Sequence, residues 1–313
     1  MHHLIFDDFF QGRAKDFLLR AIDAALAEDG RDLTSNAVFP SEQPAALALK
    51  AKEASLLAGL PLVPLVLERA AGLEGIRGGW SWEALAAEAA PVTPGRICAR
   101  ISGPARLLLR AERVILNFIG MMSGVAALTA RYVAALEGTG VKLLDTRKTL
   151  PGLRYPQKYA VLAGGGHNHR LNLEDLLMLK DNHIDAAGSI TRAVALLRAA
   201  YGSGAERPCP PIEAECRDQA EVEEAVRAGV DRIMLDNMDG PAIGAALPLI
   251  PAHIETEVSG GVSLANIREL ALAAGSASAG GGRKLDFISV GRLTHSAPAA
   301  DFSMIFSPWS ASR

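Results

Sequence analysis

Short apolar runs recur along the chain from Lys142 onward, and a polar or charged residue stands at or just after the end of each run. Most of the stretches between them are rich in alanine and carry apolar residues at helical spacing, as in Ile190–Ala200 and Gln219–Ala228. Strands that alternate with helices predict a parallel sheet, and functional side chains at the strand ends favour a β/α barrel over an open sheet. The six runs are 142–145, 175–180, 211–215, 232–236, 254–257 and 285–291.

The first third of the chain predicts a different, mixed α and β architecture. Phe17–Leu26 carries apolar residues at helical spacing, and Arg96–Ile101 alternates in the manner of a strand. Residues 105–135 are helical in pattern, with Met121–Gly124 as either a break or a point of close packing.

Composition excludes several classes of partner. The net charge of −3 gives no global basic field that would attract nucleic acid or an anionic membrane. Three cysteines form no paired spacing, which favours a reducing compartment. The N-terminus lacks the pattern of a signal peptide, and the longest apolar stretch, 55–67, is interrupted by two prolines. We therefore expect a cytoplasmic protein that binds neither nucleic acid nor a membrane.

Five cationic or imidazole side chains follow the predicted strands. Arg147 and Lys148 follow one strand, His169 and Arg170 follow three glycines, and Lys180 ends the next strand. Gathered at one barrel face, they predict a pocket for an anion, because arginine suits carboxylates and lysine suits phosphate. Either Arg147 or Lys148 alone is more simply read as a solvated loop charge.

Carboxylates form a second set. Period-2 geometry places Glu213 and Glu215 on one face of their strand, where an unpaired buried charge is costly. With Asp236, they offer hard oxygen ligands of the kind that suits magnesium, which takes one or two protein carboxylates plus substrate phosphates. The alternative is a structural ion pair with Lys148 or Lys180.

Glycines after the last strands indicate a phosphate site. Ser259, Gly260 and Gly261 follow the penultimate strand, and Gly291 follows the last. Glycine lets the main chain approach a phosphate, and this position matches the usual phosphate site of barrels. A Ser-Gly-Gly sequence alone is more often a simple turn.

Two other chemistries have weaker support. The spacing His167-Asn168-His169 fits no strong zinc template, so zinc is not expected. Lys180 at a strand end is also compatible with a Schiff-base lysine, although its cationic neighbours fit an anion pocket better.

Six strings of residues resemble one known family, the quinolinate phosphoribosyltransferases, and the likeness covers nearly the whole chain. They are Asp145–Arg154, Gly164–Arg170, Leu179–His183, Met234–Met238, Glu257–Gly261 and Val290–Ser296. Ala27–Thr34 and Ala111–Arg113 extend the likeness into the first third.

The resemblance implies an N-terminal open α/β sandwich and an incomplete β/α barrel of about six parallel strands. The sandwich would span residues 1–118 and be joined by the tail 296–313, and the barrel would span 119–295. The resemblance also implies a homodimer in which each active site is completed by the partner chain.

The same resemblance implies the substrates and their contacts. Quinolinate and phosphoribosyl pyrophosphate would react, with magnesium bound alongside the pyrophosphate and no organic cofactor. The two carboxylates of quinolinate would be held by Arg147, His169, Arg170 and Lys180, with Arg113 of the partner subunit. The pyrophosphate and magnesium would be managed by Lys148, Glu215 and Asp236, the latter two as metal ligands. The 5′-phosphate would be taken by Ser259, Gly260, Gly261 and Gly291, with His295 close by.

The chain departs from the family pattern in three places. Val258 replaces a small polar residue, Arg292 replaces an alanine, and the stretch 273–282 is longer than usual and is expected to be a mobile surface loop. Three rival functions remain. They are a related barrel protein associated with molybdate transport, a lyase that uses Lys180 covalently, and a catalytically silent binding protein.

Overall fold

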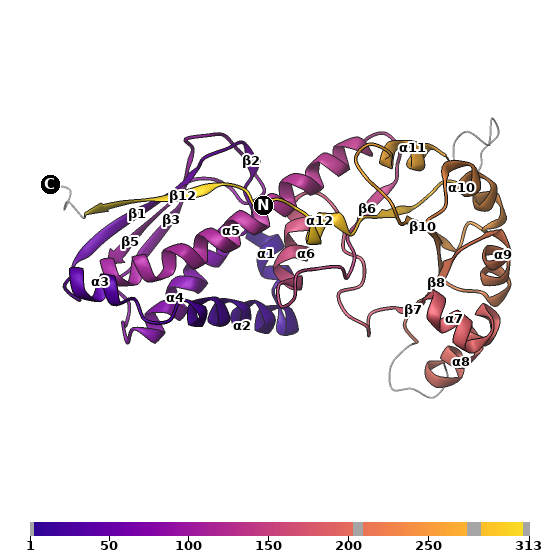
Figure 1. The fold of residues 1–313 in the computed structure, drawn as a ribbon, viewed down its shortest axis with the longest axis horizontal. Coiled ribbons are helices and arrows are strands. Elements are labelled where there is room, and N and C mark those ends of the chain that lie inside the picture. The colour runs from indigo at the N-terminus through magenta and orange to yellow at the C-terminus, as the bar shows by residue number, and fades with distance from the viewer. Residues whose placement is uncertain (1–2, 203–208, 274–282, 309–313) are drawn as a thin grey trace. The chain divides into compact units, whose positions relative to one another are not determined.

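The computed structural model describes residues 3–202, 209–273 and 283–308, and the expected loop over 274–282 lies outside this range. The chain forms two compact units. The first contains residues 1–129, 149–165 and 293–313, and the second contains residues 130–148 and 166–292. Each unit has its own sheet (Figure 1).

The first unit is built on an antiparallel sheet in the order β12-β1-β5-β3. The burial of β1 alternates along its length, so one of its faces lies against the core. The strands of this unit are β1 Pro44–Ala51, β2 Ser55–Leu56, β3 Ser81–Ala84, β4 Pro91–Val92, β5 Ile97–Pro104 and β12 Phe302–Pro308. Its helices are α1 His3–Phe9, α2 Gly12–Glu28, α3 Leu33–Val38, η1 Leu60–Leu62, α4 Val63–Leu73 and α6 Arg154–Ala163.

A single helix, α5, spans Ala105–Ala135 without a break and runs from the first unit into the second. The predicted break near Met121–Gly124 is therefore wrong, and the alternative of close packing is confirmed. A Cβ atom on Gly124 would lie 1.9 Å from the carbonyl oxygen of Pro298. Among the described helices, only α5 is long and apolar enough to cross a membrane, and 67% of its most apolar stretch is buried inside the protein.

The second unit is built on six parallel strands in the order β6-β11-β10-β9-β8-β7. All six correspond to the apolar runs in the sequence, so the predicted parallel sheet is confirmed. Within the described part of the chain, β6 and β7 do not pair with each other, so the sheet stays open, as the incomplete barrel requires. The strands are β6 Lys142–Leu144, β7 Leu177–Leu179, β8 Ile212–Cys216, β9 Arg232–Asp236, β10 Glu255–Ser259 and β11 Phe287–Ser289.

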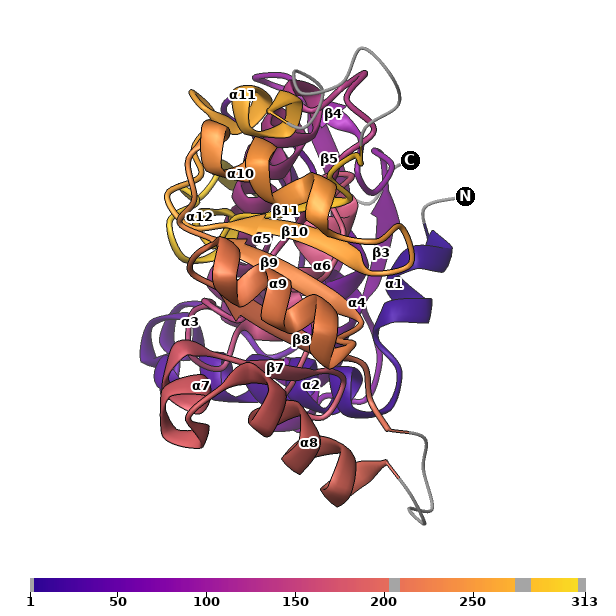
Figure 2. The same ribbon diagram turned by 90° about the vertical axis from the view of Figure 1, so that its right-hand side faces the viewer.

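Helices cover the outer face of this sheet, as Figure 2 shows for α9 and α10. They are α7 Asp181–Ala187, α8 Ile190–Tyr201, α9 Gln219–Ala228, α10 Gly240–Ala246, η2 Leu247–Leu249 and α11 Ile267–Leu272, and the short α12 Arg292–His295 follows β11. Three of these helices, α8, α9 and α10, have an N-cap residue whose side chain accepts a hydrogen bond from a main-chain amide of the first turn. These residues are Ser189, Asp218 and Asp239. These caps set where each helix begins after its strand.

The two units differ from the predicted domain limits at α5 and α6. Residues 149–165 were placed in the barrel domain by sequence, but they belong to the first unit, where α6 packs on α2. The sequence pattern cannot show this, because an amphipathic helix does not identify the surface that it covers.

Candidate active site

The registers of the parallel strands place the charged residues of β8, β9 and β10 on one face of the sheet. Glu213 pairs with Arg232, which pairs in turn with Glu255. Asp236 pairs with Ser259 in the same way. Residues that are paired across parallel strands point to the same face, and so do residues two apart on one strand. Glu213 and Glu215 therefore lie on one face of the sheet, as predicted, and the paired residues of β9 and β10 lie on the same face.

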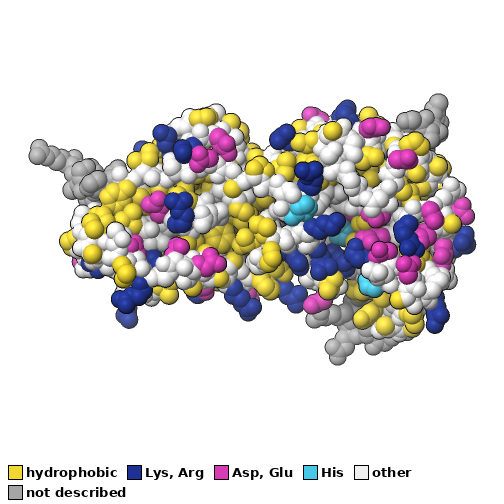
Figure 3. Space-filling view, in the orientation of Figure 1, with side chains coloured by type: hydrophobic (Ala, Val, Ile, Leu, Met, Phe, Trp, Pro, Cys, Tyr) yellow, Lys and Arg dark blue, Asp and Glu magenta, His cyan; other side chains and the backbone are white. Residues whose placement is uncertain are grey.

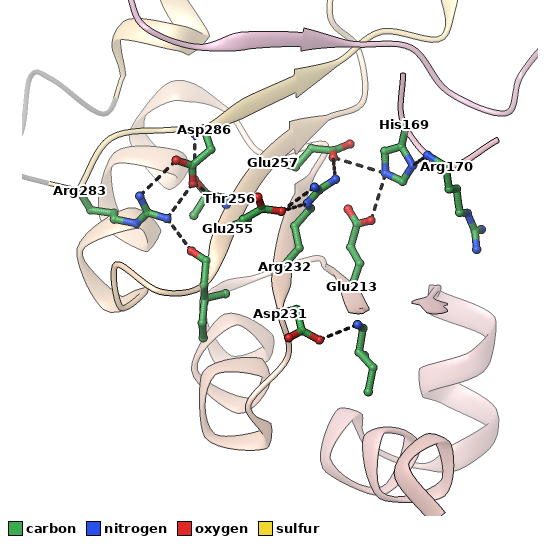
Figure 4. A network of polar contacts seen from close by, with 12 residues as sticks. His169, Arg170, Glu213, Asp231, Arg232, Glu255, Thr256, Glu257, Arg283 and Asp286 are labelled. Carbon is green, nitrogen blue, oxygen red and sulfur yellow. Dashed lines mark hydrogen bonds and ion pairs between the residues drawn. The ribbon is translucent and has the colours of Figure 1, made fainter. Parts of the chain in front are cut away.

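The centre of this face is a buried cluster of one histidine and two carboxylates (Figure 4). His169 Nε2 lies 3.0 Å from Glu213 Oε2 and 3.5 Å from Glu257 Oε2, and both glutamate side chains are fully buried. The guanidinium of Arg232 lies between β8 and β10, with Nη1 3.4 Å from Glu257 Oε2. Its other hydrogen bonds go to the more exposed Glu255.

Burial makes ionisation of this carboxylate pair costly. It raises the pKa of Glu213 to about 7, with Arg232 opposing the rise and Glu215 adding to it. Burial and the neighbouring Glu213 raise the pKa of Glu257 to about 7, against the opposing effects of His169 and Arg232. The pair therefore retains a proton more readily than exposed glutamates do near neutral pH.

His169, Glu213 and Glu257 also form a group that has the donor atoms of a metal site, since one ligand atom from each lies within 4.8 Å of the others. The guanidinium of Arg232 already brings a positive charge to Glu257. A metal cation bound to Glu257 would be repelled by the guanidinium of Arg232. We therefore interpret this group as a charge network, and the sequence-based expectation that the histidines do not form a zinc site stays a prediction.

Two of the predicted cationic residues, Arg147 and Arg170, lie within electrostatic reach of each other. Burial and the nearby Arg147 lower the pKa of Arg170, and Glu213 and Glu215 oppose this effect. Lys180 forms an ion pair with Glu215, so the structural ion pair that the sequence left open for this carboxylate is present. Figure 3 shows Lys and Arg side chains gathered beside Asp and Glu side chains on the face that it presents. The structure thus brings His169, Arg170 and Lys180 of the cationic set to Glu213 and Glu215 of the carboxylate set.

Asp145 connects two of the segments that carry these cations. It lies directly after β6 and is fully buried. Its Oδ1 accepts a hydrogen bond from the main-chain amide of His169 at 2.9 Å, and its Oδ2 accepts one from Asn168 Nδ2 at 2.6 Å. The carboxylate therefore joins the loop before Arg147 to the loop that carries His169. Lys148 is exposed in the first of these loops, and its amide donates to Thr146 Oγ1.

The glycine turn after β10 brings the main chain of Gly260 close to Asn237, and its expected role in phosphate binding stays a prediction. Gly260 has φ +87°, and a Cβ atom there would lie 2.1 Å from Asn237 Oδ1. The amide of Asn237 donates to the carbonyl of Ser259 at 2.8 Å, and its side chain donates to Asp236 Oδ2. The carboxyl ends of β9 and β10 are thereby held together, with Gly261 in open space beside them.

Three predicted site residues lie outside these contacts. Arg113 and His295 belong to the first unit, and both are exposed, with His295 Nδ1 2.7 Å from Ser296 Oγ. Gly291 follows β11 in the second unit. Two of the positions that depart from the family pattern are described by the structure. Val258 is buried on the opposite face of β10, where the covering helices favour an apolar side chain, and Arg292 is exposed.

Sequence reasoning missed four polar residues of this site, namely Asp145, Arg232, Asn237 and Glu257. Two of them carried a usable signal, because Arg232 and Glu257 are charged residues inside apolar strands, as Glu213 is. Nothing in the sequence shows which of these charges meet.

Comparisons with known proteins identify the family of this chain. The family model described as "Quinolinate phosphoribosyl transferase, C-terminal domain" matches residues 125–305, and that described as "Quinolinate phosphoribosyl transferase, N-terminal domain" matches residues 32–123. The chain is 42% identical over 210 residues to the probable nicotinate-nucleotide pyrophosphorylase [carboxylating] of Bacillus subtilis, covering 67% of this chain and 68% of that protein. It is 35% identical over 294 residues to the nicotinate-nucleotide pyrophosphorylase [carboxylating] of Mycobacterium leprae, covering 93% and 96% of the two chains.

A solved structure gives the same result for the fold. NadC from Streptococcus pyogenes superimposes with a TM-score of 0.81 at 39% identity, covering 93% of this chain and 96% of that one. Both family models, the near full-length relatives and the shared fold lead to one conclusion: the chain belongs to the quinolinate phosphoribosyltransferase family.

Proposed function

We propose that this protein transfers the phosphoribosyl group of phosphoribosyl pyrophosphate to quinolinate, and that it releases nicotinate mononucleotide, pyrophosphate and carbon dioxide. This is a step of NAD biosynthesis. The observation that carries the proposal is that Arg170 lies within electrostatic reach both of Arg147 and of the β8 carboxylates Glu213 and Glu215. A dicarboxylate and a pyrophosphate both need such cations, and a metal-bound phosphate needs the carboxylates.

Quinolinate would bind at the cationic end of this face. Burial and the nearby Arg147 lower the pKa of Arg170, so the two guanidinium groups lie within electrostatic reach of each other, and an anion bound between them would be attracted by both. Arginine forks are suited to the paired oxygens of a carboxylate. Lys180, now paired with Glu215, has a half-exposed side chain from which it can also reach an anion.

Glu215 and Asp236 fit magnesium by the chemistry of their donor atoms. They are carboxylates at the ends of adjacent strands and on the same face, and magnesium takes only one or two such ligands from protein. When bound, magnesium would neutralise charge on the pyrophosphate group of the donor. Lys148, exposed in the neighbouring loop, would add a positive charge for the same group. The turn Ser259–Gly261 would hold the 5′-phosphate.

The reaction then requires little proton transfer from the protein. Loss of pyrophosphate from C1 of the ribose leaves an oxocarbenium-like centre, and the pyridine nitrogen donates its electron pair to that carbon. The ring nitrogen becomes cationic, the bond from C2 to its carboxylate breaks, and carbon dioxide leaves. The electron pair stays on C2 until it takes a proton. The contribution of this chain is to orient the two substrates and to complement their charges.

We also propose that the working form is a homodimer in the cytoplasm, in which Arg113 of the partner subunit reaches the quinolinate carboxylates. Its exposed position on α5 supports a contact outside its own chain. Mixing Arg113→Ala chains with Lys148→Ala chains tests the shared site. Partial recovery of activity in the mixture supports it, and a mixture as inactive as either variant alone contradicts it.

The function itself is tested by incubating the purified protein with quinolinate, phosphoribosyl pyrophosphate and magnesium, and following nicotinate mononucleotide and carbon dioxide. We expect product only when all three are present. Turnover with nicotinate in place of quinolinate would keep the transferase and change its substrate. The absence of turnover with any pyridine acid would reject the proposal in favour of the relative associated with molybdate transport.

A further inference from the structure

Asn237, the residue directly after β9, has an uncommon main-chain conformation. Its φ is +55°, and in the described part of the chain Ala89 is the other residue besides glycine with a positive φ. Asparagine tolerates this left-handed region better than most residues, because its short side chain can form hydrogen bonds close to its own main chain. A conformation of this kind persists when the surrounding contacts hold it in place. Asn237 makes such contacts on two sides.

On one side, the side chain of Asn237 is bonded to the neighbouring carboxylate. Asn237 Nδ2 donates a hydrogen bond to Asp236 Oδ2 at 2.8 Å. This bond restrains the rotation of the carboxylate, so that its other oxygen, Oδ1, keeps a constant direction in which it can face a cation. Asn237 thereby orients Asp236, one of the two carboxylates that fit magnesium.

On the other side, Asn237 contacts the glycine turn after β10. Its main-chain amide donates to the carbonyl of Ser259 at 2.8 Å. A Cβ atom on Gly260 would lie 2.1 Å from Asn237 Oδ1 and 2.5 Å from its Cγ. The amide group of Asn237 can therefore occupy its position only because residue 260 has no side chain. One residue thus joins the carboxylate at the end of β9 to the turn that is expected to hold the 5′-phosphate.

We propose that Asn237 is a positioning residue for the phosphoribosyl pyrophosphate site, which orients Asp236 toward a bound magnesium ion through its side chain and fixes the turn after β10 through its main chain. The proposal rests on the proposed function for the identity of the substrate. The effect of Asn237 on a cation bound at Asp236 does not depend on turnover, so it can be measured with pyrophosphate alone as the anion.

Two substitutions separate the side chain of Asn237 from its main-chain conformation. Asn237→Gly removes the amide group and adopts a positive φ without strain, whereas Asn237→Ala removes the same group and adds strain. Both variants keep the main-chain bond to Ser259. The Ala variant should therefore have the lower Tm of the two, but the two variants should lose the same contribution to metal binding. Ala89→Gly, at the other positive φ, is the matched control and should leave metal binding unchanged.

Isothermal titration calorimetry of the full-length protein measures the Kd of pyrophosphate with magnesium and, in the presence of a chelator, without it. We expect magnesium to tighten pyrophosphate binding in the wild type. In both Asn237 variants this gain should be smaller by about 3- to 10-fold, the value of one hydrogen bond. The Kd without magnesium should stay within about 2-fold of the wild type, because Asp236 acts through the cation.

Three outcomes would overturn the positioning role. They are a wild type whose Kd does not depend on magnesium, an Asn237→Gly variant with the full magnesium gain, and a loss that follows the Tm and appears only in Asn237→Ala. A weaker Kd both with and without magnesium would also contradict it, since general disruption of the site has that effect. If the protein does not turn over quinolinate but the magnesium gain falls as expected in both variants, only the proposed function fails.

Discussion

Replacing Glu257 by glutamine should make the protein relatively more stable as the pH rises. The carboxyl of Glu257 is fully buried, and burial together with Glu213 raises its pKa from 4.5 to about 7. The folded protein therefore binds a proton at this site more tightly than the unfolded chain does. Such a group favours the folded state fully below the unfolded pKa, and this advantage is lost as the pH rises through the folded pKa. Glutamine resembles the protonated carboxyl in shape and does not ionise.

The size of the change in unfolding free energy follows from the pKa shift of Glu257. A rise from 4.5 to about 7 corresponds to about 3 kcal/mol in the free energy of unfolding. About 2 kcal/mol of this should be lost between pH 5 and pH 8, because the unfolded carboxyl is already mostly ionised at pH 5. The difference in unfolding free energy, Glu257→Gln minus wild type, should therefore become more favourable to the variant by about 2 kcal/mol across this range.

Urea denaturation followed by circular dichroism at several pH values between 5 and 8 measures this difference. Glu255→Gln is the matched control, since Glu255 lies two residues earlier on the same strand, bonds the same Arg232 and has a side chain that is 51% exposed. Its effect should stay within about 1 kcal/mol at every pH. A Glu257→Gln difference that is the same at pH 5 and pH 8 would refute the raised pKa and the reasoning from burial.

Three further predictions concern the pocket and the packing. Arg147→Ala should raise the quinolinate KM by about 10- to 100-fold in steady-state assays, the value of a charged hydrogen bond, whereas Arg198→Ala on the exposed face of α8 should leave it unchanged. Gly260→Ala should raise the KM for phosphoribosyl pyrophosphate and lower stability by about 2 kcal/mol or more, because φ is +87° and the new Cβ meets the asparagine after β9. In thermal unfolding, Gly124→Ala should lower the Tm, because its Cβ would lie 1.9 Å from a carbonyl of the C-terminal tail. Gly72→Ala in α4, with nothing within 4 Å, should raise stability by up to about 1 kcal/mol. An equal change in Tm for Gly124→Ala and Gly72→Ala would contradict the packing argument.

The elements of the barrel could be predicted from sequence because their signals are local. A buried parallel strand needs an apolar run, and the helix that returns to the sheet needs an apolar stripe with a period near 3.6. All six strands and the helices Ile190–Tyr201 and Gln219–Ala228 follow these rules. The break suggested near Gly124 was wrong because glycine has the same sequence signature at a helix break and at a close contact.

The sequence predicted which charged residues belong to the site, but it did not predict which of them pair with each other. Periodicity placed Glu213 and Glu215 on one face, but it did not show that Glu215 pairs with Lys180 or that Glu213 lies beside His169. His169 and Lys180 lie in the segments before and after β7, and the neighbours of β7 in the sheet depend on the strand order. A pairing energy falls steeply with distance and rises with burial, so the choice of partner needs coordinates.

What the sequence by itself determined about this protein is the kind of fold, the family, and the side chains available at the carboxyl ends of the strands. What only the tertiary structure decided is which of these side chains meet, how deeply they are buried and how their pKa values shift. The pKa of Glu257 is raised because the carboxyl is buried and because Glu213 lies nearby, and His169 lies beside both glutamates. The physical reason is that residue type and spacing are properties of the chain, whereas desolvation and charge separation are properties of neighbours that only folding brings together.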